Sequence, residues 1–492
     1  MSRVVFFGLC LRVALAAAQV MIDTVGWTSR DRQVYGPAVR FIVNDTLSGI
    51  HVVWKDSLSA IRYNFRPRQG GWRWENGIVI NSYPRNLGCL DVDITRGSAL
   101  ISTDYLSLGV PQLSYFQDTS RGWGKFVEFT FARGSRNNLI AATNYGWPKF
   151  AAIRDETLYF QSSWTSYRMG AVGPFPAHNL AASKQSGRLG CIWAVSSGPD
   201  RGALYLRQTP NNGGQWYPLV KLSDSVPSAL NRTLNGGFAT YDTIRIHLVA
   251  EFYDGRNPCL SQLWHYCPYD TPSWHLVHEC SLPESSRLGD HALAAGRPSI
   301  GIDRPKRRGD INRLYVVWEQ FDPENIEPRT GLARADIWAA SSDDNGRTWN
   351  RAVRLTEPDS TSKRFPFLAE VVDDTLHIIC FADRIAGFWE QGQGEPTRNP
   401  VLYLRVPATA LSGIAKGQPL SADREPRAAA IVRRTLFLNR GEDAVPTILL
   451  DATGRKMLVL HPGANDLRHL APGVYFMRRA EGGWREAIVR VR

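Results

Sequence analysis

The residues best suited to chemistry are isolated arginine and acidic positions in the second half of the chain. Arg364 opens the segment Arg364-Phe365-Pro366, and Asp383 ends the apolar run that follows it. A guanidinium binds a carboxylate through two parallel hydrogen bonds, and an aspartic acid can transfer a proton, so these two residues are the catalytic candidates. The simpler interpretation, which we favour, is a surface arginine at the start of a strand and no catalytic residue at all.

An acidic loop and several aromatic residues give weaker signals. Glu319, Asp322 and Glu324 could pair as acid and base, although a solvated loop is the simpler interpretation. Aromatic rings in loops can stack on sugars, and three aromatic residues in expected loops are candidates for this role: Trp164, Tyr167 and Trp389.

No pattern for a cofactor, a metal or a nucleic acid is present. The sequence has no G-x-S-x-G, H-E-x-x-H or phosphate-binding loop, and no paired cysteine or histidine spacing for zinc. Asp343 and Asp344 faintly match a calcium loop, but the glutamate that would close it is missing. The net charge is +12, yet no basic stretch has the interleaved aromatic residues of a nucleic-acid site.

The elements that must position these residues are strands. Hydrophobic residues make up 43% of the 492 positions, with almost no helical periodicity. A short strand, a turn and a strongly β-prone strand recur along the chain, which predicts an all-β fold of four-stranded sheets arranged radially. We expect a β-propeller of six or seven blades, with seven favoured. The openings of the repeats lie at 37–43, 88–92, 148–153, 180–182, 237–240, 298–302 and 366–371.

Several repeats close with a similar turn. The oxygen of an Asp or Asn bonds backbone N–H groups of its own turn, Gly supplies a positive φ, and Trp buries a large surface against the neighbouring sheet. One copy fits S-x-D-x-G-x-T-W completely, with Ser342, Asp344, Gly346, Thr348 and Trp349. A second, degenerate copy keeps Asn211, Gly213 and Trp216.

These turns resemble the Asp-box, or BNR, repeats of sialidase-type β-propellers, over residues 30–410. For an active sialidase the resemblance implies three arginines for the substrate carboxylate, a tyrosine nucleophile with a glutamate partner, and an aspartic acid. The first arginine of that family precedes Ile-Pro, whereas here Tyr35-Gly36 precedes Pro37. Arg364 before Phe365-Pro366 is similar but lies in the last repeat, so the resemblance favours the fold over the activity.

The tail, residues 435–492, reads alone as a small β-sandwich module with turns at Gly454 and Gly473. It also resembles the C-terminal sorting domain of the type IX (Por) secretion system of bacteria. That family pairs a D-x-x-G-R turn with an L-x-x-G-x-Y strand, matched here by Asp451, Gly454, Arg455, Leu470, Gly473 and Tyr475. The resemblance implies the type IX secretion machinery as a partner and delivery across an outer membrane, whereas an ordinary accessory domain is the alternative.

The N-terminus predicts export. A basic start, an apolar run and the A-x-A pattern of Ala16 and Ala18 indicate a signal peptide over residues 1–18. Outside it no apolar run is long enough for a transmembrane helix. Of the six cysteines left, Cys259 and Cys280 could face each other across a hairpin and be oxidised, although connectivity cannot be read from sequence.

The predicted organisation is therefore a signal peptide (1–18), an Asp-box β-propeller (19–410), a linker (411–434) and a C-terminal sorting domain (435–492). We expect a secreted protein, extracellular or on the outer-membrane surface, that binds a glycan or a protein without catalysis. The alternatives are an exo-acting glycoside hydrolase of sialidase type and a structural or adhesive component of the cell envelope.

Overall fold

The protein is described from a computed structural model. The structure describes residues 20–33, 39–56, 59–81, 85–93, 95–144, 148–162, 165–174, 177–303, 311–411, 430–432, 435–438, 447–451, 455–461, 463–471, 473–479 and 484–490. The chain divides into two units, residues 1–416 and 417–492. The predicted signal peptide, most of the predicted linker, Trp164 and Gly454 lie outside the described residues.

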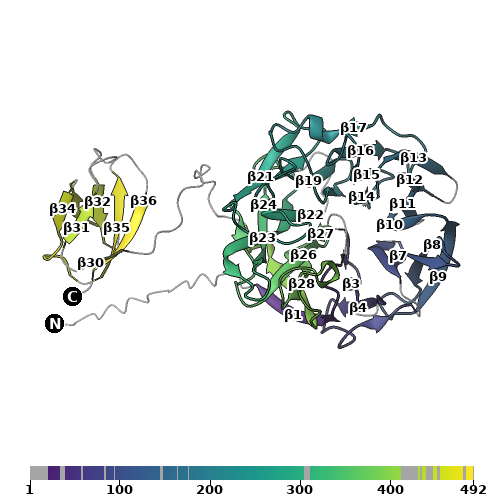
Figure 1. Ribbon diagram of the computed structural model, residues 1–492, viewed down its shortest axis with the longest axis horizontal. Coiled ribbons are helices and arrows are strands. Elements are labelled where there is room, and N and C mark those ends of the chain that lie inside the picture. Colours follow the sequence, from purple (N-terminus) through teal and green to yellow (C-terminus); the bar gives the residue numbers. More distant parts are fainter. Residues whose placement is uncertain are drawn as a thin grey trace, which may run out of the picture. The chain divides into compact units, whose positions relative to one another are not determined.

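The first unit is a seven-bladed β-propeller (Figure 1), so the prediction of an all-β fold with seven blades is confirmed. From the inner to the outer strand, the first three blades are β2 (Ile42–Asp45), β3 (Gly49–Lys55), β4 (Ile61–Pro67) and β5 (Ile78–Val79); β6 (Asn86–Asp93), β7 (Ser98–Ser107), β8 (Val110–Asp118) and β9 (Phe126–Arg133); and β10 (Arg136–Ala142), β11 (Pro148–Arg154), β12 (Thr157–Gln161) and β13 (Ser166–Ala171).

The next three blades have the same order. They are β14 (Ala177–Ala182), β15 (Leu189–Ala194), β16 (Leu204–Thr209) and β17 (Val220–Lys221); β18 (Gly237–Tyr241), β19 (Ile246–Phe252), β20 (Leu260–Tyr266) and β21 (Trp274–Ser281); and β22 (Ala295–Asp303), β23 (Leu314–Ile326), β24 (Ala333–Ser342) and β25 (Val353–Arg354). The described helices are three single turns, η1 (Leu222–Asp224), η2 (Trp389–Gln391) and η3 (Ala408–Ala410). None of them has the length needed to cross a membrane.

The seventh blade joins the two ends of the propeller sequence. Its inner strands are β26 (Ser362–Leu368), β28 (Thr375–Asp383) and β29 (Asn399–Pro407), and its outer strand is β1 (Met21–Thr28). β1 runs antiparallel to β29 from Met21↔Arg405 to Thr28↔Asn399. The short β27 (Val371–Val372) pairs in parallel with β22 of the sixth blade. The ring is thus closed by backbone hydrogen bonds.

Antiparallel order also determines which loops meet. In every blade, the loop from the second to the third strand and the loop from the fourth strand to the next blade leave from the same edge of the sheet. Together these loops form one face of the propeller, which we call the upper face. The loops from the first to the second strand lie on the opposite face.

A buried ionic network crosses the channel between the inner strands. The Arg40 guanidinium lies 3.1 Å from Asp91 Oδ2 and 3.1 Å from Glu370 Oε2, and it donates to Leu180 O at 2.7 Å. Lys184 Nζ donates to Asp91 Oδ1 at 2.5 Å. Because Arg40, Asp91 and Glu370 are buried, removing one of them would leave an uncompensated charge. The network links inner strands far apart in sequence.

The turn of residues 342–349 fastens the sixth blade to the fifth. Ser342 Oγ accepts from Gly346 N (2.8 Å), and Asp344 Oδ1 accepts from Thr348 N (2.8 Å). Gly346 O accepts from Nδ1 of His265, on β20, at 3.1 Å. Trp349 packs edge-on against the same imidazole ring, with centroids 5.7 Å apart. These contacts hold the turn against the neighbouring blade, as the motif predicts.

The degenerate turn packs in a similar way. Asn211 Oδ1 accepts from Gln215 N at 2.8 Å, and Gly213 N donates to Thr209 Oγ1 at 3.1 Å. Trp216 lies edge-on against Phe160 of the third blade, with centroids 5.0 Å apart, and stacks on Tyr167 at 5.6 Å. Tyr167 is therefore part of this packing, which argues against its predicted role in stacking on sugars.

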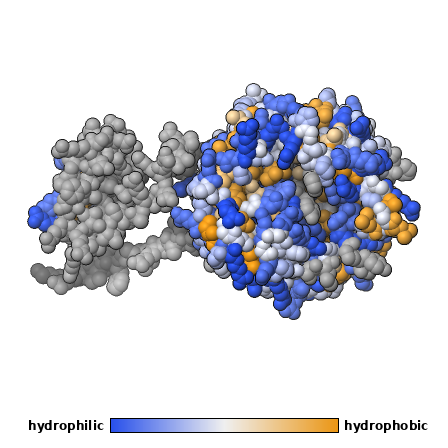
Figure 2. All heavy atoms as spheres, in the orientation of Figure 1, coloured by the Kyte–Doolittle hydropathy of each residue, from blue (hydrophilic) through white to orange (hydrophobic). Residues whose placement is uncertain are grey.

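Polar side chains dominate the face of the propeller that Figure 2 shows, and hydrophobic patches interrupt them. One patch lies on the side where Figure 1 places β8 and β9. The exposed apolar residues of the second blade are Leu106, Leu108, Val110, Trp123, Val127 and Phe129.

All six described cysteines are buried and free. In the pairing of β20 with β21, the residue opposite Cys280 is Ser261. Cys259 lies two residues before Ser261 and is therefore only diagonal to Cys280. The pKa of the Cys280 thiol is raised to about 12 by burial. The Cys259–Cys280 disulfide that the hairpin spacing allowed is therefore not formed among these residues.

The second unit is a small β module. One sheet has the order β30 (Ala430–Val432), β36 (Trp484–Arg490), β35 (Gly473–Arg479), β32 (Thr447–Leu450) and β33 (Lys456–Leu460); the other pairs β31 (Thr435–Leu438) with β34 (Gly463–Asp466). Asp451 Oδ1 accepts from Arg455 N at 3.0 Å in the turn after β32. Leu470 and Tyr475 belong to its core. The predicted β module is confirmed, and its sorting role stays a prediction.

The turn at Gly346 gives a direct test of the blade contact. A Cβ at Gly346 would lie 2.3 Å from His265 Cε1, and its φ is +86°. We expect Gly346→Ala to lower the free energy of unfolding by about 2–5 kcal/mol, from backbone strain and overpacking together. Gly198 has φ +74° with nothing within 4 Å, so Gly198→Ala should cost only about 1–2 kcal/mol. Equal losses of unfolding free energy for the two variants in urea unfolding would show that the His265 side chain moves away from the new methyl group at no cost.

Candidate functional site

Four inner strands carry a register shift where they begin, at the upper face, and two of these belong to the adjacent sixth and seventh blades. The pairing of β22 with β23 shifts between Gly296 and Ser299, and that of β26 with β28 shifts between Arg364 and Phe367. Arg297 and Phe365, inside these bulges, have φ of 51° and 53°. A bulge turns a side chain away from the regular alternation of the strand, and the positive φ of Arg297 and Phe365 adds backbone strain there.

The bulges direct two arginines onto one glutamate. Arg364 Nη2 lies 2.8 Å from Glu319 Oε1, Arg297 Nε lies 3.2 Å from the same oxygen, and Phe365 N donates to Oε2 at 3.0 Å. Arg364 is 3% exposed and Glu319 is 1% exposed. Burial alone raises the pKa of Glu319, but Arg364 and Arg297 together hold it below its usual value. The cluster is a desolvated ionic contact between the sixth and seventh blades.

Two sequence-based interpretations are therefore wrong. Arg364 is a buried arginine and not a surface residue, and Glu319 is ion-paired inside the protein and not part of a solvated loop. The sequence misled because the partners, Glu319 and Arg364, are 45 positions apart and meet only when adjacent blades pack.

A third arginine completes the cluster. The Arg32 guanidinium lies 5.3 Å from the centroid of the Phe388 ring and its Nη1 lies 3.6 Å from Asp290 Oδ2. Arg364 covers the same ring at 4.6 Å. Arg32 was not among the sequence candidates; it precedes the first blade, and it does not occupy the position directly before X-Pro where the sialidase resemblance implies an arginine.

A pair of buried carboxyl groups lies beside the arginines. Asp383 Oδ1 accepts from Asn399 Nδ2 at 3.0 Å and from Ile385 N at 3.1 Å. Asp31 accepts from the backbone N–H of Trp389. Burial raises the pKa of Asp31 to about 6 and that of Asp383 to about 7, and the charge of Asp31 contributes to the latter. Asp383 and Arg364 thus share one region, but no ion pair joins them among the described residues.

Trp389 fastens this region and does not offer a free ring. Its Nε1 donates to Ser29 O at 2.9 Å, and its neighbour Glu390 forms an ion pair with Arg30. The loop between β28 and β29 is therefore tied to the segment that follows β1, which weakens the predicted role of Trp389 in sugar stacking.

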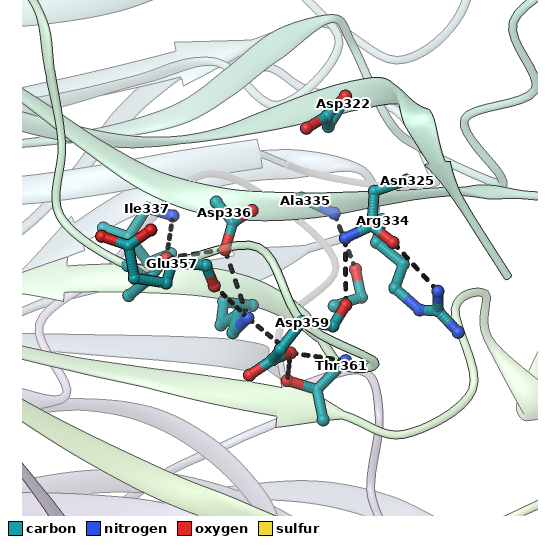
Figure 3. Close-up of polar contacts among 12 residues, drawn as sticks. Asp322, Asn325, Arg334, Ala335, Asp336, Ile337, Glu357, Asp359 and Thr361 are labelled. Atoms are coloured by element: carbon teal, nitrogen blue, oxygen red, sulfur yellow. Dashed lines mark hydrogen bonds and ion pairs between the residues drawn. The ribbon is translucent and has the colours of Figure 1, made fainter.

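A second polar cluster braces the same two blades further from the channel (Figure 3). Asp336 on β24 and Asp359 before β26 face each other, and Lys363 Nζ lies 3.3 Å from Asp336 Oδ1 and 2.6 Å from Asp359 Oδ1. Asp336 also pairs with Arg354. Neighbouring residues Lys363 and Arg364 thus serve two separate ionic clusters, and both hold β26 against the sixth blade.

A pocket of about 460 Å³ opens among three loops of the upper face: 282–294, 327–332 and 384–398. Leu332 and Ile385 are the apolar residues of the lining, and Arg287 and Arg329 are among its polar residues. Both arginines are exposed, and neither guanidinium makes a hydrogen bond or ion pair with a residue that the structure describes. The complete lining is Arg287, Arg329, Thr330, Leu332, Ile385, Gly392, Gln393, Gly394 and Glu395.

The pocket walls are connected to the buried cluster. Gln393 Oε1 accepts from Asp290 N (3.1 Å) and from Phe388 N (3.2 Å), and Phe388 is the ring under the buried arginines. Gly387 has φ +121°, and a Cβ there would lie 2.4 Å from Gln393 O, so the loop can double back only with glycine. The loop shape that creates the pocket thus depends on the residues beneath it.

The described residues contain no group of three or more His, Cys, Asp or Glu side chains that could hold a metal ion. Five of their tyrosine hydroxyls form the hydrogen bonds seen here, to an aspartate, a glutamine, two histidines and a backbone carbonyl, and none of these partners is a glutamate. The tyrosine–glutamate pair that the sialidase resemblance implies is therefore not assembled in the described part of the chain.

No family model matches this chain, and neither does any curated protein. Solved propellers are similar to it. An ulvan lyase of polysaccharide lyase family PL25, bound to -[GlcA(1-4)Rha3S]-, shares 10% identity over 74% of this chain and 94% of its own, with a TM-score of 0.46. A Hadza microbial sialidase shares 12% identity over 78% of this chain and 69% of its own, with a TM-score of 0.38.

A lectin from Burkholderia pseudomallei is also similar, with 12% identity over 74% of this chain and 92% of its own and a TM-score of 0.41. Similarity at this level leaves the function of the chain to be argued from its own residues.

The raised pKa of Asp383 predicts a pH-dependent cost. The folded chain binds a proton at Asp383 up to about pH 7, whereas an unfolded aspartate releases it near 3.8, so this group lowers stability as pH rises through that window. Asparagine can accept the same N–H groups without the charge. We expect Asp383→Asn to raise the unfolding free energy at pH 8 by at least about 1 kcal/mol, since one pKa unit corresponds to about 1.4 kcal/mol.

Urea unfolding at pH 5, 6, 7 and 8 measures this effect, and the gain should shrink toward acid pH. The exposed Asp374→Asn is the matched control and should show no such trend. A loss of stability in Asp383→Asn that is equal at every pH would mean that the carboxylate charge itself is needed.

Proposed function

We propose that the protein is a binding propeller, without a catalytic role, that holds an acidic saccharide in the upper-face pocket. The observation that carries this proposal is the contrast between its arginines. Arg297 and Arg364 are buried and occupied by Glu319, whereas Arg287 and Arg329 are exposed and line a pocket of about 460 Å³. A guanidinium matches a carboxylate or a sulfate bidentately, so the free pair supplies the recognition of an anion.

The remaining lining suits a sugar. The volume lies within the usual range of about 300–1,000 Å³ for small-molecule sites. Glu395 can accept from sugar hydroxyls, and the Nε2 group of Gln393 is a donor because its Oε1 is already occupied by two backbone N–H groups. Leu332 and Ile385 give the apolar face of a sugar ring a surface to rest on.

A glycoside hydrolase of sialidase type is the competing function, and one observation favours it. Asp31 and Asp383 have pKa values of about 6 and about 7, as raised by burial, which suits proton transfer near neutral pH. Against it, Asp383 is only 7% exposed and Arg364 is occupied by Glu319. A purely structural or adhesive role would not need a concave polar pocket with two unoccupied arginines.

Export belongs to the same proposal. The signal-peptide pattern and the sorting-domain motif support delivery to the outside of the cell, where polysaccharides are available. We expect deletion of residues 435–492 to retain the propeller inside a bacterium that carries the type IX system, while the full chain reaches the surface or the medium. Immunoblots of cell fractions check this, and equal export of both chains would contradict the role of the tail.

Binding to a glycan array and to uronate-containing and sulfated oligosaccharides tests the pocket in the full chain. We expect Arg287→Gln and Arg329→Gln each to weaken binding about tenfold or more, because each removes a charge-assisted contact of about 1.5–3 kcal/mol. Arg351 is also exposed and lies outside the pocket, so Arg351→Gln is the matched control and should bind normally.

Two outcomes would overturn the proposal. Binding that survives in the double variant Arg287→Gln/Arg329→Gln would place the ligand elsewhere. Turnover of a fluorogenic sialoside that Arg364→Ala abolishes, in a variant that still folds, would establish the hydrolase instead.

A further inference from the structure

The hairpin between β7 and β8 projects beyond the other strands of the second blade at the upper face. β6 begins to pair with β7 at Asp104, and β9 stops pairing with β8 at Gln112, so residues 105–110 extend past both neighbouring strands. In the third blade the corresponding hairpin ends at Arg154↔Thr157, and its neighbouring strands reach to within one residue of that end. We call residues 105–110 the hairpin tip.

The hairpin tip is apolar. Leu106 is 72% exposed, Leu108 is fully exposed and Val110 is 44% exposed. Single exposed leucines are common on protein surfaces and need no explanation. Three exposed apolar side chains at the end of a projecting hairpin are different, because they form the part of the blade that meets another surface first.

Leu108 also occupies a strained turn position. Leu108 and Gly109 form a two-residue turn between the paired residues Ser107 and Val110, with φ of 52° and 78°. Turns with positive φ at both positions favour Asn, Asp and Gly, because a Cβ is disfavoured at positive φ. Leu108 is fully exposed, so its side chain gains no internal packing in return. Strain without internal compensation points to a contact outside the chain.

Two arginines flank the base of the hairpin tip. Arg133 lies opposite Gln112 at the end of β9. Gly134 N donates to Pro111 O at 2.8 Å, which holds the turn between Arg133 and Arg136 beside the hairpin. Both arginines are exposed, and neither side chain makes a hydrogen bond or ion pair with a residue that the structure describes.

Few acidic groups offset these two charges. Segments 105–112 and 131–137 contain no Asp or Glu. Asp104 is buried, and Glu128 on β9 is already ion-paired. The acidic turn 155–156 of the third blade is exposed, but it belongs to the hairpin that lacks the extension. The hairpin tip therefore combines an apolar end with unpaired guanidiniums at its base.

We propose that the hairpin tip inserts into a lipid surface and that Arg133 and Arg136 contact anionic headgroups around the point of insertion. Acyl chains accept an apolar tip without a complementary pocket, and headgroup phosphates accept hydrogen bonds from guanidiniums. A protein partner suits the tip less well. A stable protein interface covers about 800 Å² on each partner, and three exposed side chains supply only a small part of that area.

Insertion would orient the propeller. The hairpin tip and the upper-face pocket lie on the same face of the ring, so a propeller held by this tip turns the pocket toward the lipid surface. The tip shares no residue with the pocket. Lipid binding therefore does not depend on the saccharide proposal and can be measured without a saccharide.

Cosedimentation of the full chain with lipid vesicles tests the proposal. We expect binding to vesicles of phosphatidylcholine and phosphatidylglycerol, and weaker binding to phosphatidylcholine alone or at high salt. Leu108→Ser should lower the partition coefficient about tenfold or more, because serine does not gain from leaving water. Arg133→Gln and Arg136→Gln should each lower binding about fivefold, and only on the anionic vesicles.

Leu47→Ser is the matched control, because Leu47 is 78% exposed in a loop of the opposite face, and it should bind like the wild type. The thermal midpoint of Leu108→Ser should equal that of the wild type, since the side chain it removes is exposed. The proposal is wrong if the wild type binds neither vesicle or if Leu108→Ser binds as tightly. A dimer in lipid-free buffer that Leu108→Ser abolishes would assign the tip to a second copy instead.

A second readout reports the depth of the tip. The described cysteines are all buried, so Leu108→Cys in a chain that also carries Cys10→Ser places one reactive thiol at the tip. An environment-sensitive fluorophore there should shift its emission to shorter wavelength on the anionic vesicles and be quenched by spin labels in the acyl chains. The same label at Leu47→Cys should show neither change. An unchanged emission at position 108 on bound protein would contradict insertion.

Discussion

The closure of the propeller by β1 is the constraint on which the rest of the structure depends. A ring of sheets has no free edge only if the first strand of the chain completes the last blade, as β1 does against β29. This pairing delivers residues 29–33 to the upper face beside loops that are more than 350 positions away in sequence. Arg30, Asp31 and Arg32 reach their partners for this reason alone.

The interior of the upper face is organised by charge rather than by apolar packing. Glu319 is shared by two guanidiniums, and both arginines also lie over phenylalanine rings, at 4.7 Å for Arg297 and 4.6 Å for Arg364. A buried ion pair contributes little net stability, but removing one member is costly because the other remains charged and desolvated. Such a cluster determines which loop conformations are allowed above it, and here those loops form the pocket.

The repeats and their turns could be read from the sequence because each lies within one local segment. The alternation of β-prone residues and the complete turn from Ser342 to Trp349 specify a hairpin whatever surrounds it. The site could not be read in this way. Its contacts join residues of different blades, and Arg297 and Phe365 reach them through bulges that no local pattern announces. Arg364 and Asp383 were identified as positions of interest, but their burial and partners were not.

Arginine has opposite roles a few residues apart in this fold, and desolvation separates them. A guanidinium removed from water must be paired within the protein, as Arg364 is with Glu319, and it is then unavailable to a ligand. Arg287 and Arg329 remain hydrated, so they cost nothing to keep unpaired until an anion replaces their water. Counting arginines near the channel therefore says little about anion binding; what matters is which of them are already neutralised within the protein.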